Sequence, residues 1–144
     1  MITKSYDDAI GRGITQTSKN IFRRLSVHLK EYDITPEQWT VLKRLGENDG
    51  VTQKELSSTS EKDQATLTRI LDILERKRLM ERKPNKEDRR SFLIYITESG
   101  KQLSLELFPL IEKIFNEEIL VGINKEEIAT FSRVLDKIKQ NTAH

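Results

Sequence analysis

Cysteine is absent from this chain of 144 residues, and histidine occurs only twice. Without thiols the chain can form neither a disulfide framework nor a thiolate metal site, and it cannot sense oxidants through cysteine. A His-rich metal site is also not expected. No apolar run approaches the ~20 residues of a membrane-spanning helix. Residues 1–10 are polar and contain two aspartates, unlike a signal peptide, so we expect a soluble, cytoplasmic protein.

Sequence motifs of catalytic sites are missing as well. The chain has no Gly-rich phosphate loop, no nucleophile and base at motif spacing, and no cluster of metal ligands. Its two histidines, His28 and His144, stand alone, and we interpret them as a packing residue and a tail residue. We therefore expect a protein that is not an enzyme and that carries neither a cofactor nor a metal.

Positive charge is concentrated in one short segment. The whole chain has a formal net charge of only +2. Residues 76–90, however, hold eight Lys and Arg against three Asp and Glu, whereas residues 1–75 and 98–144 are each slightly acidic. A local basic patch is typical of a surface that binds a polyanion. A solvated loop with scattered bases would have the same composition, so charge alone leaves both interpretations open.

Apolar residues at helical spacing, together with capping residues, predict six helices. Thr35 suits an N-cap, Pro36 the first helical position, and Gln38 the reciprocal side of a capping box. Thr52 and Glu55 form a second sequence of this kind. The first helix is expected over residues of about 5–30, and the other helix starts lie at Thr35, Thr52, Asp63, Thr97 and Asn124.

Two short strands around a basic turn are expected between the fourth and fifth helices. Residues 79–83 form the first candidate strand, and residues 91–97 form the second, which is rich in apolar, β-branched and aromatic side chains. The turn at residues 84–88 is rich in turn formers. Short third and fourth helices followed by such a hairpin have the size and order of a winged helix-turn-helix, expected at about residues 35–97. The predicted fold class is therefore mainly α with a small β-hairpin wing.

The outer helices, at about residues 5–30 and 98–141, carry more apolar side chains at helical spacing than one small module can bury. This surplus predicts a subunit interface, and so a homodimer of single-domain chains of residues 1–144 with long terminal dimerisation helices. Pro109 falls inside the fifth helix, where a kink or break is expected.

The fourth helix supplies the candidates for contacting DNA bases. The second helix of a helix-turn-helix lies in the major groove, and side chains of its first turns reach base edges. Gln pairs with adenine, Arg with guanine, and the methyl groups of Ala and Thr contact the thymine methyl. An exposed polar face without any partner would show the same pattern. The candidates are Gln64, Ala65, Thr66, Thr68 and Arg69.

The turn of the predicted wing offers cations on a projecting ribbon. Lys83, Lys86 and Arg89 could contact phosphates, which adds affinity without sequence information. An arginine that enters a narrow minor groove meets enhanced negative potential. Asp88 would be repelled by DNA, so we expect it to hold Arg90 across the turn by a charge-assisted hydrogen bond. The alternative is a solvated loop whose ion pairs contribute little.

Two segments resemble the MarR family of transcriptional regulators. Residues 62–75 resemble the recognition helix of that family. Asp88-Arg89-Arg90-Ser91, followed by Leu93, Ile96-Thr97 and Gly100, resembles its Asp-x-Arg wing motif and its Thr-x-x-Gly helix start. The segment at residues 35–39 fits as well, so the resemblance covers nearly the whole chain.

This resemblance implies a dimer built from the first and the last two helices, with two winged modules on a pseudo-palindromic operator. Half-sites about one turn of double-stranded DNA apart follow from twofold symmetry. Arg90 matches the family's wing arginine that enters the minor groove, and Asp88 matches its orienting partner. The implied function is sequence-specific transcriptional regulation, as a repressor. The alternative is a winged-helix module that binds protein without specific DNA binding, which the basic turn disfavours.

Many members of the family release DNA when small aromatic or phenolic compounds bind in a crevice between the dimer helices and the winged module. Such an effector is therefore expected for this chain as well. Phe22, His28, Tyr32 and Trp39 lie in the corresponding helices. We interpret each of them as a core residue and assign no effector site.

Overall fold

The computed structural model describes residues 5–143. Residues 1–4 of the polar N-terminal segment and the terminal His144 lie outside this range. The chain forms two compact units, residues 1–111 and residues 112–144. Within the described range no helix is both long and apolar enough to cross a membrane.

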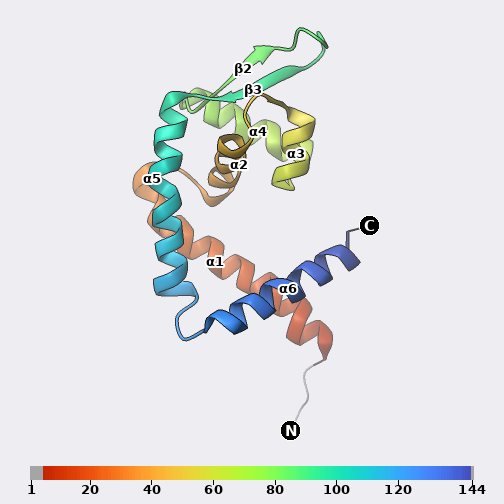
Figure 1. Ribbon diagram of the computed structural model, residues 1–144, viewed down its shortest axis with the longest axis vertical. Coiled ribbons are helices and arrows are strands. Elements are labelled where there is room, and N and C mark those ends of the chain that lie inside the picture. The colour runs from red at the N-terminus through yellow and green to blue at the C-terminus, as the bar shows by residue number, and fades with distance from the viewer. Residues whose placement is uncertain (1–4, 144) are drawn as a thin grey trace. The chain divides into compact units, whose positions relative to one another are not determined.

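The elements follow the predicted order, with helices before and after a small sheet along the chain (Figure 1). The N-terminal helix has a π-helical first segment, and the C-terminal segment also contains a π-helical turn. The predicted fold class, mainly α with a β-hairpin wing, is confirmed. The elements are η1 (Asp7–Arg12), α1 (Gly13–Leu29), η2 (Lys30–Tyr32), α2 (Pro36–Glu47), β1 (Val51–Thr52), α3 (Gln53–Ser60), α4 (Gln64–Arg76), β2 (Met80–Pro84), β3 (Phe92–Ile96), α5 (Glu98–Ile114), η3 (Phe115–Ile119) and α6 (Lys125–Asn141).

The helix starts lie where the capping residues predict them. Thr35 accepts the backbone N–H of Gln38 at 3.1 Å, and the Gln38 side chain accepts the N–H of Thr35 at 3.2 Å, so the capping box is complete. At Thr52 only half of the predicted box forms, because the Glu55 carboxylate accepts from the Thr52 hydroxyl instead of its backbone N–H. Predicted caps also form at Asp63, Thr97 and Asn124.

The core of the first unit fixes the orientation of α4. Each fully buried aliphatic side chain contributes about 1.5–3 kcal/mol relative to an exposed one, so burial of one face strongly favours a single rotation of this helix about its axis. Side chains of α2 and of the sheet complete the same core. The buried residues of α4 are Leu67, Ile70, Leu71 and Leu74, and their neighbours in the core include Leu42, Leu45, Met80, Ile94 and Ile96.

The sheet has three antiparallel strands in the order β1-β3-β2, one more than the sequence predicts. The additional strand, Val51–Thr52, pairs with Ile94 and Leu93 of β3. Beyond its end, Asp49 takes the place of a strand residue, since its Oδ1 accepts the N–H of Ile96 at 2.8 Å. Two residues carry no detectable strand pattern, so only the distant partner strand makes this segment extended.

Helix α5 continues through Pro109 to Ile114, so the break expected at this proline does not occur. A proline removes one backbone hydrogen bond and crowds the carbonyl of the residue four positions before it. That residue is Leu105, whose exposure is 76%, and Pro109 is exposed as well. Water can therefore satisfy the unbonded carbonyl, and the helix tolerates the proline on its exposed side.

Candidate DNA-binding surface

The first turns of α4 present the polar face that the sequence predicts. Gln64, Ala65, Thr68 and Arg69 are exposed, while Leu67 between them is fully buried. The apolar face therefore holds the helix against the core, and the candidate base contacts point away from it. The structure brings these four residues together on one accessible surface.

Thr66 and Arg69 are each engaged within the chain. The Thr66 hydroxyl donates to Oδ2 of Asp63 at 3.0 Å, so this candidate belongs to the helix cap. Arg69 lies 3.8 Å from the Glu37 carboxylate of α2, and the two side chains are 62% and 40% exposed. An exposed pair of this kind contributes about 0–1 kcal/mol, so Arg69 can exchange Glu37 for another acceptor at little cost.

Asp63 holds the start of α4 by accepting the backbone N–H of Thr66 at 2.7 Å. This bond, and next the bond from the Thr66 hydroxyl, keep the pKa of the Asp63 carboxyl below its ordinary value. Since the pKa is lower in the folded state, the stabilisation is fully present above the unfolded-state pKa of about 4. It is lost as the pH falls through the folded-state value.

We expect Asp63→Ala to lower the melting temperature at neutral pH and to lower it progressively less as the pH falls below about 4. Asp63→Asn retains an acceptor oxygen without the charge, so it should destabilise less and show a weaker acid dependence. Thermal unfolding followed by circular dichroism measures both effects. A difference between wild type and Asp63→Ala that stays constant down to pH 2 would contradict this role of the ionised cap.

Asp88 organises the wing turn through the backbone. Its Oδ1 accepts the N–H of Arg90 at 3.0 Å, whereas Asn85 accepts the N–H of Glu87 and donates to the Ser91 hydroxyl. The side-chain contact that we expected between Asp88 and the Arg90 guanidinium is not what the structure shows. A short polar side chain that bonds the backbone two residues on is a common device for fixing turns. The Arg90 side chain itself stays exposed.

The predicted DNA contacts of the wing, to phosphates and to the minor groove, differ in their surroundings. Lys86, Arg89 and Arg90 are exposed in the turn, and the structure gives none of them an ion pair among the described residues. Lys83 lies 3.6 Å from Glu81 and 4.8 Å from the centroid of the Tyr95 ring. The turn therefore carries three available cations, and Lys83 is already partly held within the sheet.

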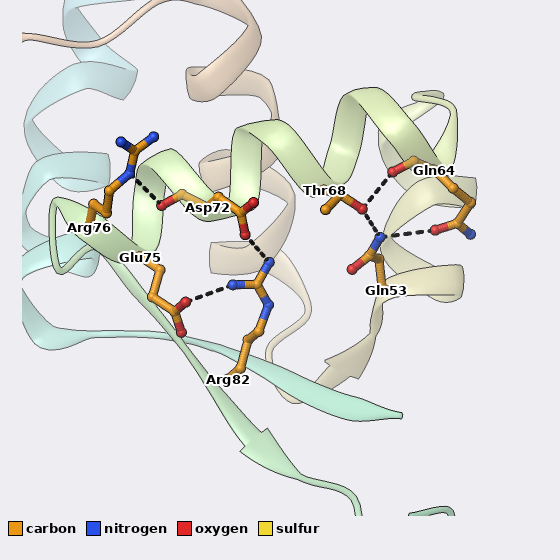
Figure 2. A network of polar contacts seen from close by, with 7 residues as sticks. All are labelled: Gln53, Gln64, Thr68, Asp72, Glu75, Arg76 and Arg82. Carbon is orange, nitrogen blue, oxygen red and sulfur yellow. Dashed lines mark hydrogen bonds and ion pairs between the residues drawn. The ribbon is translucent and has the colours of Figure 1, made fainter. Parts of the chain in front are cut away.

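Arg82, which the sequence does not single out, joins the wing to α4. It reaches from β2 toward α4 and lies between two acidic residues (Figure 2). Its Nη2 is 2.9 Å from Asp72 and its Nη1 is 2.7 Å from Glu75, and the side chain is only 18% exposed. Charge-assisted bonds that are partly shielded from water are the stronger kind. One of the eight positive charges in residues 76–90 thus serves an internal contact.

A sequence signal for Arg82 exists, although it is visible only in retrospect. Alternation along a strand places residue 82 on the same face as Met80, which is buried. Acids at positions 72 and 75 share one face of the helix. The pairing between strand and helix, however, depends on how the two pack.

We expect Arg82→Met to destabilise the first unit by about 1–2 kcal/mol, because two carboxylates then face each other without their cation. Amide hydrogen exchange should increase in β2 and β3 more than in α2. Arg89→Met is the matched control, since it removes an arginine from the same hairpin without an internal partner. Equal protection of β2 in the two variants would show that the contact does not hold the wing.

The wing and the start of α3 enclose a shared cavity of about 210 Å³. Its lining includes Gln53, Lys54, Arg82 and Arg90. The cavity therefore places the turn, β2 and β3 beside the start of α3, and Phe92 and Ile94 complete its lining.

The four residues of the possible effector crevice are not all core residues. Trp39 is buried, in agreement with our interpretation, and His28 and Tyr32 are partly buried. Phe22 is 42% exposed, so its interpretation as a core residue is wrong for the single chain. It lies on α1, where the sequence predicts a subunit interface.

Comparison with known proteins identifies a family for this chain. The model of the MarR family matches residues 34–92. The multiple antibiotic resistance protein MarR of Escherichia coli K12 is 30% identical over 129 residues, which cover 90% of each chain. SarZ of Staphylococcus aureus, an HTH-type transcriptional regulator, is 34% identical over 101 residues, 70% of this chain and 68% of its own.

A solved structure extends the similarity to three dimensions. The crystal structure of a MarR mutant from E. coli complexed with operator DNA has a TM-score of 0.85 and 29% sequence identity. The alignment covers 94% of this chain and 99% of that one. Sequence similarity over nearly the full length and the shared fold lead to one conclusion: this chain belongs to the MarR family.

Proposed function

We propose that this protein is a transcriptional regulator that binds a pseudo-palindromic operator in double-stranded DNA as a homodimer. The observation that carries the proposal is the pairing, within one compact unit, of an exposed polar face on α4 with a projecting turn of three available cations. The helix supplies base contacts in the major groove through Gln64, Ala65, Thr68 and Arg69. The turn supplies Arg90 to the minor groove and Lys86 and Arg89 to phosphates.

The relative of known structure supports this assignment, because the MarR mutant with the same fold was crystallised with operator DNA. We propose the role of a repressor, with release from the operator by a small aromatic or phenolic effector. We propose no catalytic role. Thr66 and Lys83 contribute less to the proposed DNA contacts. Thr66 completes the helix cap, and Lys83 lies against the Tyr95 ring.

Exposed apolar side chains support the homodimer. None of the residues of α6 is buried in the single chain, although the helix carries an apolar stripe. In that second unit Phe131 is 61% exposed and Val134 is 43% exposed. In the first unit Ile10 and Ile14 are 42% and 41% exposed. Apolar surface of this kind is typical of a subunit interface. Sedimentation equilibrium of Phe131→Asp, compared with wild type, tests whether it holds a dimer together.

The central experiment is selection of bound duplexes from a randomised double-stranded DNA pool, followed by affinity measurement on the selected sequence. We expect an inverted repeat with half-sites about one turn apart. The logarithm of the association constant should fall linearly with the logarithm of salt concentration, by about 0.9 for each phosphate contact. Arg69→Ala should relax the preference at particular base pairs.

Lys137→Ala is the control for net charge, because it removes one exposed cation from α6, outside the proposed DNA-binding surface, and sedimentation equilibrium checks that its oligomeric state is that of wild type. It should leave the affinity and the salt dependence unchanged. If wild-type protein retains no duplex from the pool even at low salt, DNA binding is not its function. The alternative of a protein-binding winged-helix module would then replace this proposal.

A further inference from the structure

Gln53, the first residue of α3, connects two of the side chains that we assign to base contacts. Its Nε2 donates to the Gln64 side-chain oxygen at 3.1 Å and to the Thr68 hydroxyl at 2.7 Å. Figure 2 shows the Gln53 side chain extending from α3 to the first turns of α4, where both partners lie. No local pattern in the sequence predicts this contact, since the partners follow 11 and 15 residues later.

The hydrogen bonds of this cluster determine which atoms remain for DNA. The two N–H groups of the Gln53 amide are both used, one for each partner. The Thr68 hydroxyl donates its only proton to the backbone oxygen of Gln64 at 2.8 Å and accepts from Gln53. The Gln64 oxygen has accepted one bond and keeps a second lone pair. Thr68 therefore offers its methyl group to a partner, while its proton is not available.

The Gln64 amide is held in one orientation as a result. Its oxygen is directed at α3, so its two N–H groups and one remaining lone pair face the surroundings. A glutamine that presents one donor and one acceptor side by side pairs with N7 and N6 of adenine, and a threonine methyl contacts the methyl of thymine. Without Gln53 the exposed amide could exchange the positions of its oxygen and nitrogen, and the preference would be lost.

We propose that Gln53 is a specificity-determining residue, which positions Gln64 and Thr68 for an A·T base pair without itself supplying the base contact. The inference rests on the proposed function, because it requires that α4 lie in the major groove. It assigns to α3 a part in sequence recognition. Residues of this helix would otherwise serve only to support α4.

The test is selection of duplexes from the randomised pool with wild type, Gln53→Ala and Gln64→Ala, followed by affinities for the selected duplex and for each single base-pair variant of it. For wild type we expect an A·T pair at one position of each half-site. Gln53→Ala should reduce discrimination there by about tenfold, which corresponds to about 1.4 kcal/mol. Other positions and non-specific DNA should be affected less than twofold.

Two further variants separate positioning from a merely structural role. The double variant Gln53→Ala with Gln64→Ala should discriminate no worse than Gln64→Ala, because both substitutions remove the same contact. Gln53→Glu has the same shape but no amide donors, so the Gln64 amide should turn its nitrogen toward the carboxylate and its oxygen outward. The preferred base pair at that one position should then change, beyond a uniform loss of affinity from the added negative charge.

The outcomes distinguish this inference from the proposed function. If Gln53→Ala weakens binding equally on every duplex, Gln53 contacts phosphate or supports the fold, and the inference fails while DNA binding stands. Unchanged discrimination in Gln53→Ala, or additive losses in the double variant, would also overturn it. If wild type selects no duplex, the proposed function is wrong, and the inference, which depends on it, is wrong as well. Melting temperatures of the variants within a few degrees of wild type show that each remains folded.

Discussion

Replacement of Arg90 by alanine is expected to reduce operator affinity by about 1–3 kcal/mol for each half-site. The Arg90 backbone is fixed by its N–H bond to Asp88, and its side chain is exposed in the turn of the hairpin. The turn is thus already ordered before binding, and a narrow minor groove attracts the guanidinium because its negative potential is enhanced. Because a dimer binds with two wings, the loss of binding free energy for the dimer is about twice that of one half-site. Fluorescence anisotropy with the selected duplex measures it.

Arg89→Ala is the matched control, since the two arginines are adjacent and both exposed. We assign Arg89 to phosphate, so its removal should weaken binding to all sequences alike and reduce the salt slope by about one for each wing. Arg90→Lys should recover only part of the lost affinity, because a compact ammonium lacks the planar fork of donors. An unchanged affinity of Arg90→Ala, or a loss equal to that of Arg89→Ala on every duplex, would refute the wing assignment.

Gly100→Ala is expected to destabilise the first unit by about 3 kcal/mol, the upper end of the usual cost of overpacking. A Cβ atom at this position would lie 2.2 Å from the backbone oxygen of Leu79 and 2.7 Å from the Ile96 side chain. The Leu79 oxygen also accepts the N–H of Thr97, so it cannot move without breaking the start of α5. Overpacking against backbone has no side-chain rotation to relieve it, and it belongs to the most destabilising class of substitutions.

Gly13→Ala provides the comparison, because nothing lies within 4 Å of a Cβ atom built there. Gly13 begins α1, and alanine is favoured over glycine in helices by up to about 1 kcal/mol. In urea unfolding, the free energy of unfolding should therefore fall for Gly100→Ala and rise for Gly13→Ala, relative to wild type. If Gly100→Ala were as stable as wild type, α5 and the segment before β2 could separate, contrary to their close approach in the structure.

The sequence resemblance singles out Gly100, and the structure supplies the reason. The Thr-x-x-Gly helix start combines two functions within one turn. The Thr97 hydroxyl accepts the N–H of Gly100 at 3.1 Å and donates to the Arg78 oxygen at 2.7 Å. The missing side chain at Gly100 then admits the Leu79 carbonyl. The motif thus fastens α5 to the chain that leads from α4 into the wing.

Sequence alone located the basic segment at residues 76–90, but the structure divides its charges between two uses. Arg82 is paired with Asp72 and Glu75, and Lys77 with Asp33. Lys86, Arg89 and Arg90 of the turn stay exposed without an ion pair among the described residues, and Arg76 and Arg78 are exposed as well. A count of charges along the sequence does not separate paired cations from unpaired ones, because it does not show which acidic groups lie near them in space.

Local features of this protein were determined by the sequence itself. Thr35, Asp63 and Thr97 begin their helices as predicted, because an N-cap bonds to a backbone group only three residues away. The rotation of α4 followed from its apolar periodicity for a similar reason, since side chains three and four apart share a face. The polar face of this helix, and with it most of the candidate base contacts, could therefore be predicted.

Contacts between segments distant in the sequence were decided only by the tertiary structure. The strand β1 forms because β3 lies beside it, and Arg82 is paired because β2 packs beside α4. Gln53 reaches Gln64 and Thr68 because α3 packs against α4. None of these bonds has a periodic or local signature, since each depends on the three-dimensional approach of two elements. The sequence thus determined which side chains α4 exposes, and packing decided how they are held.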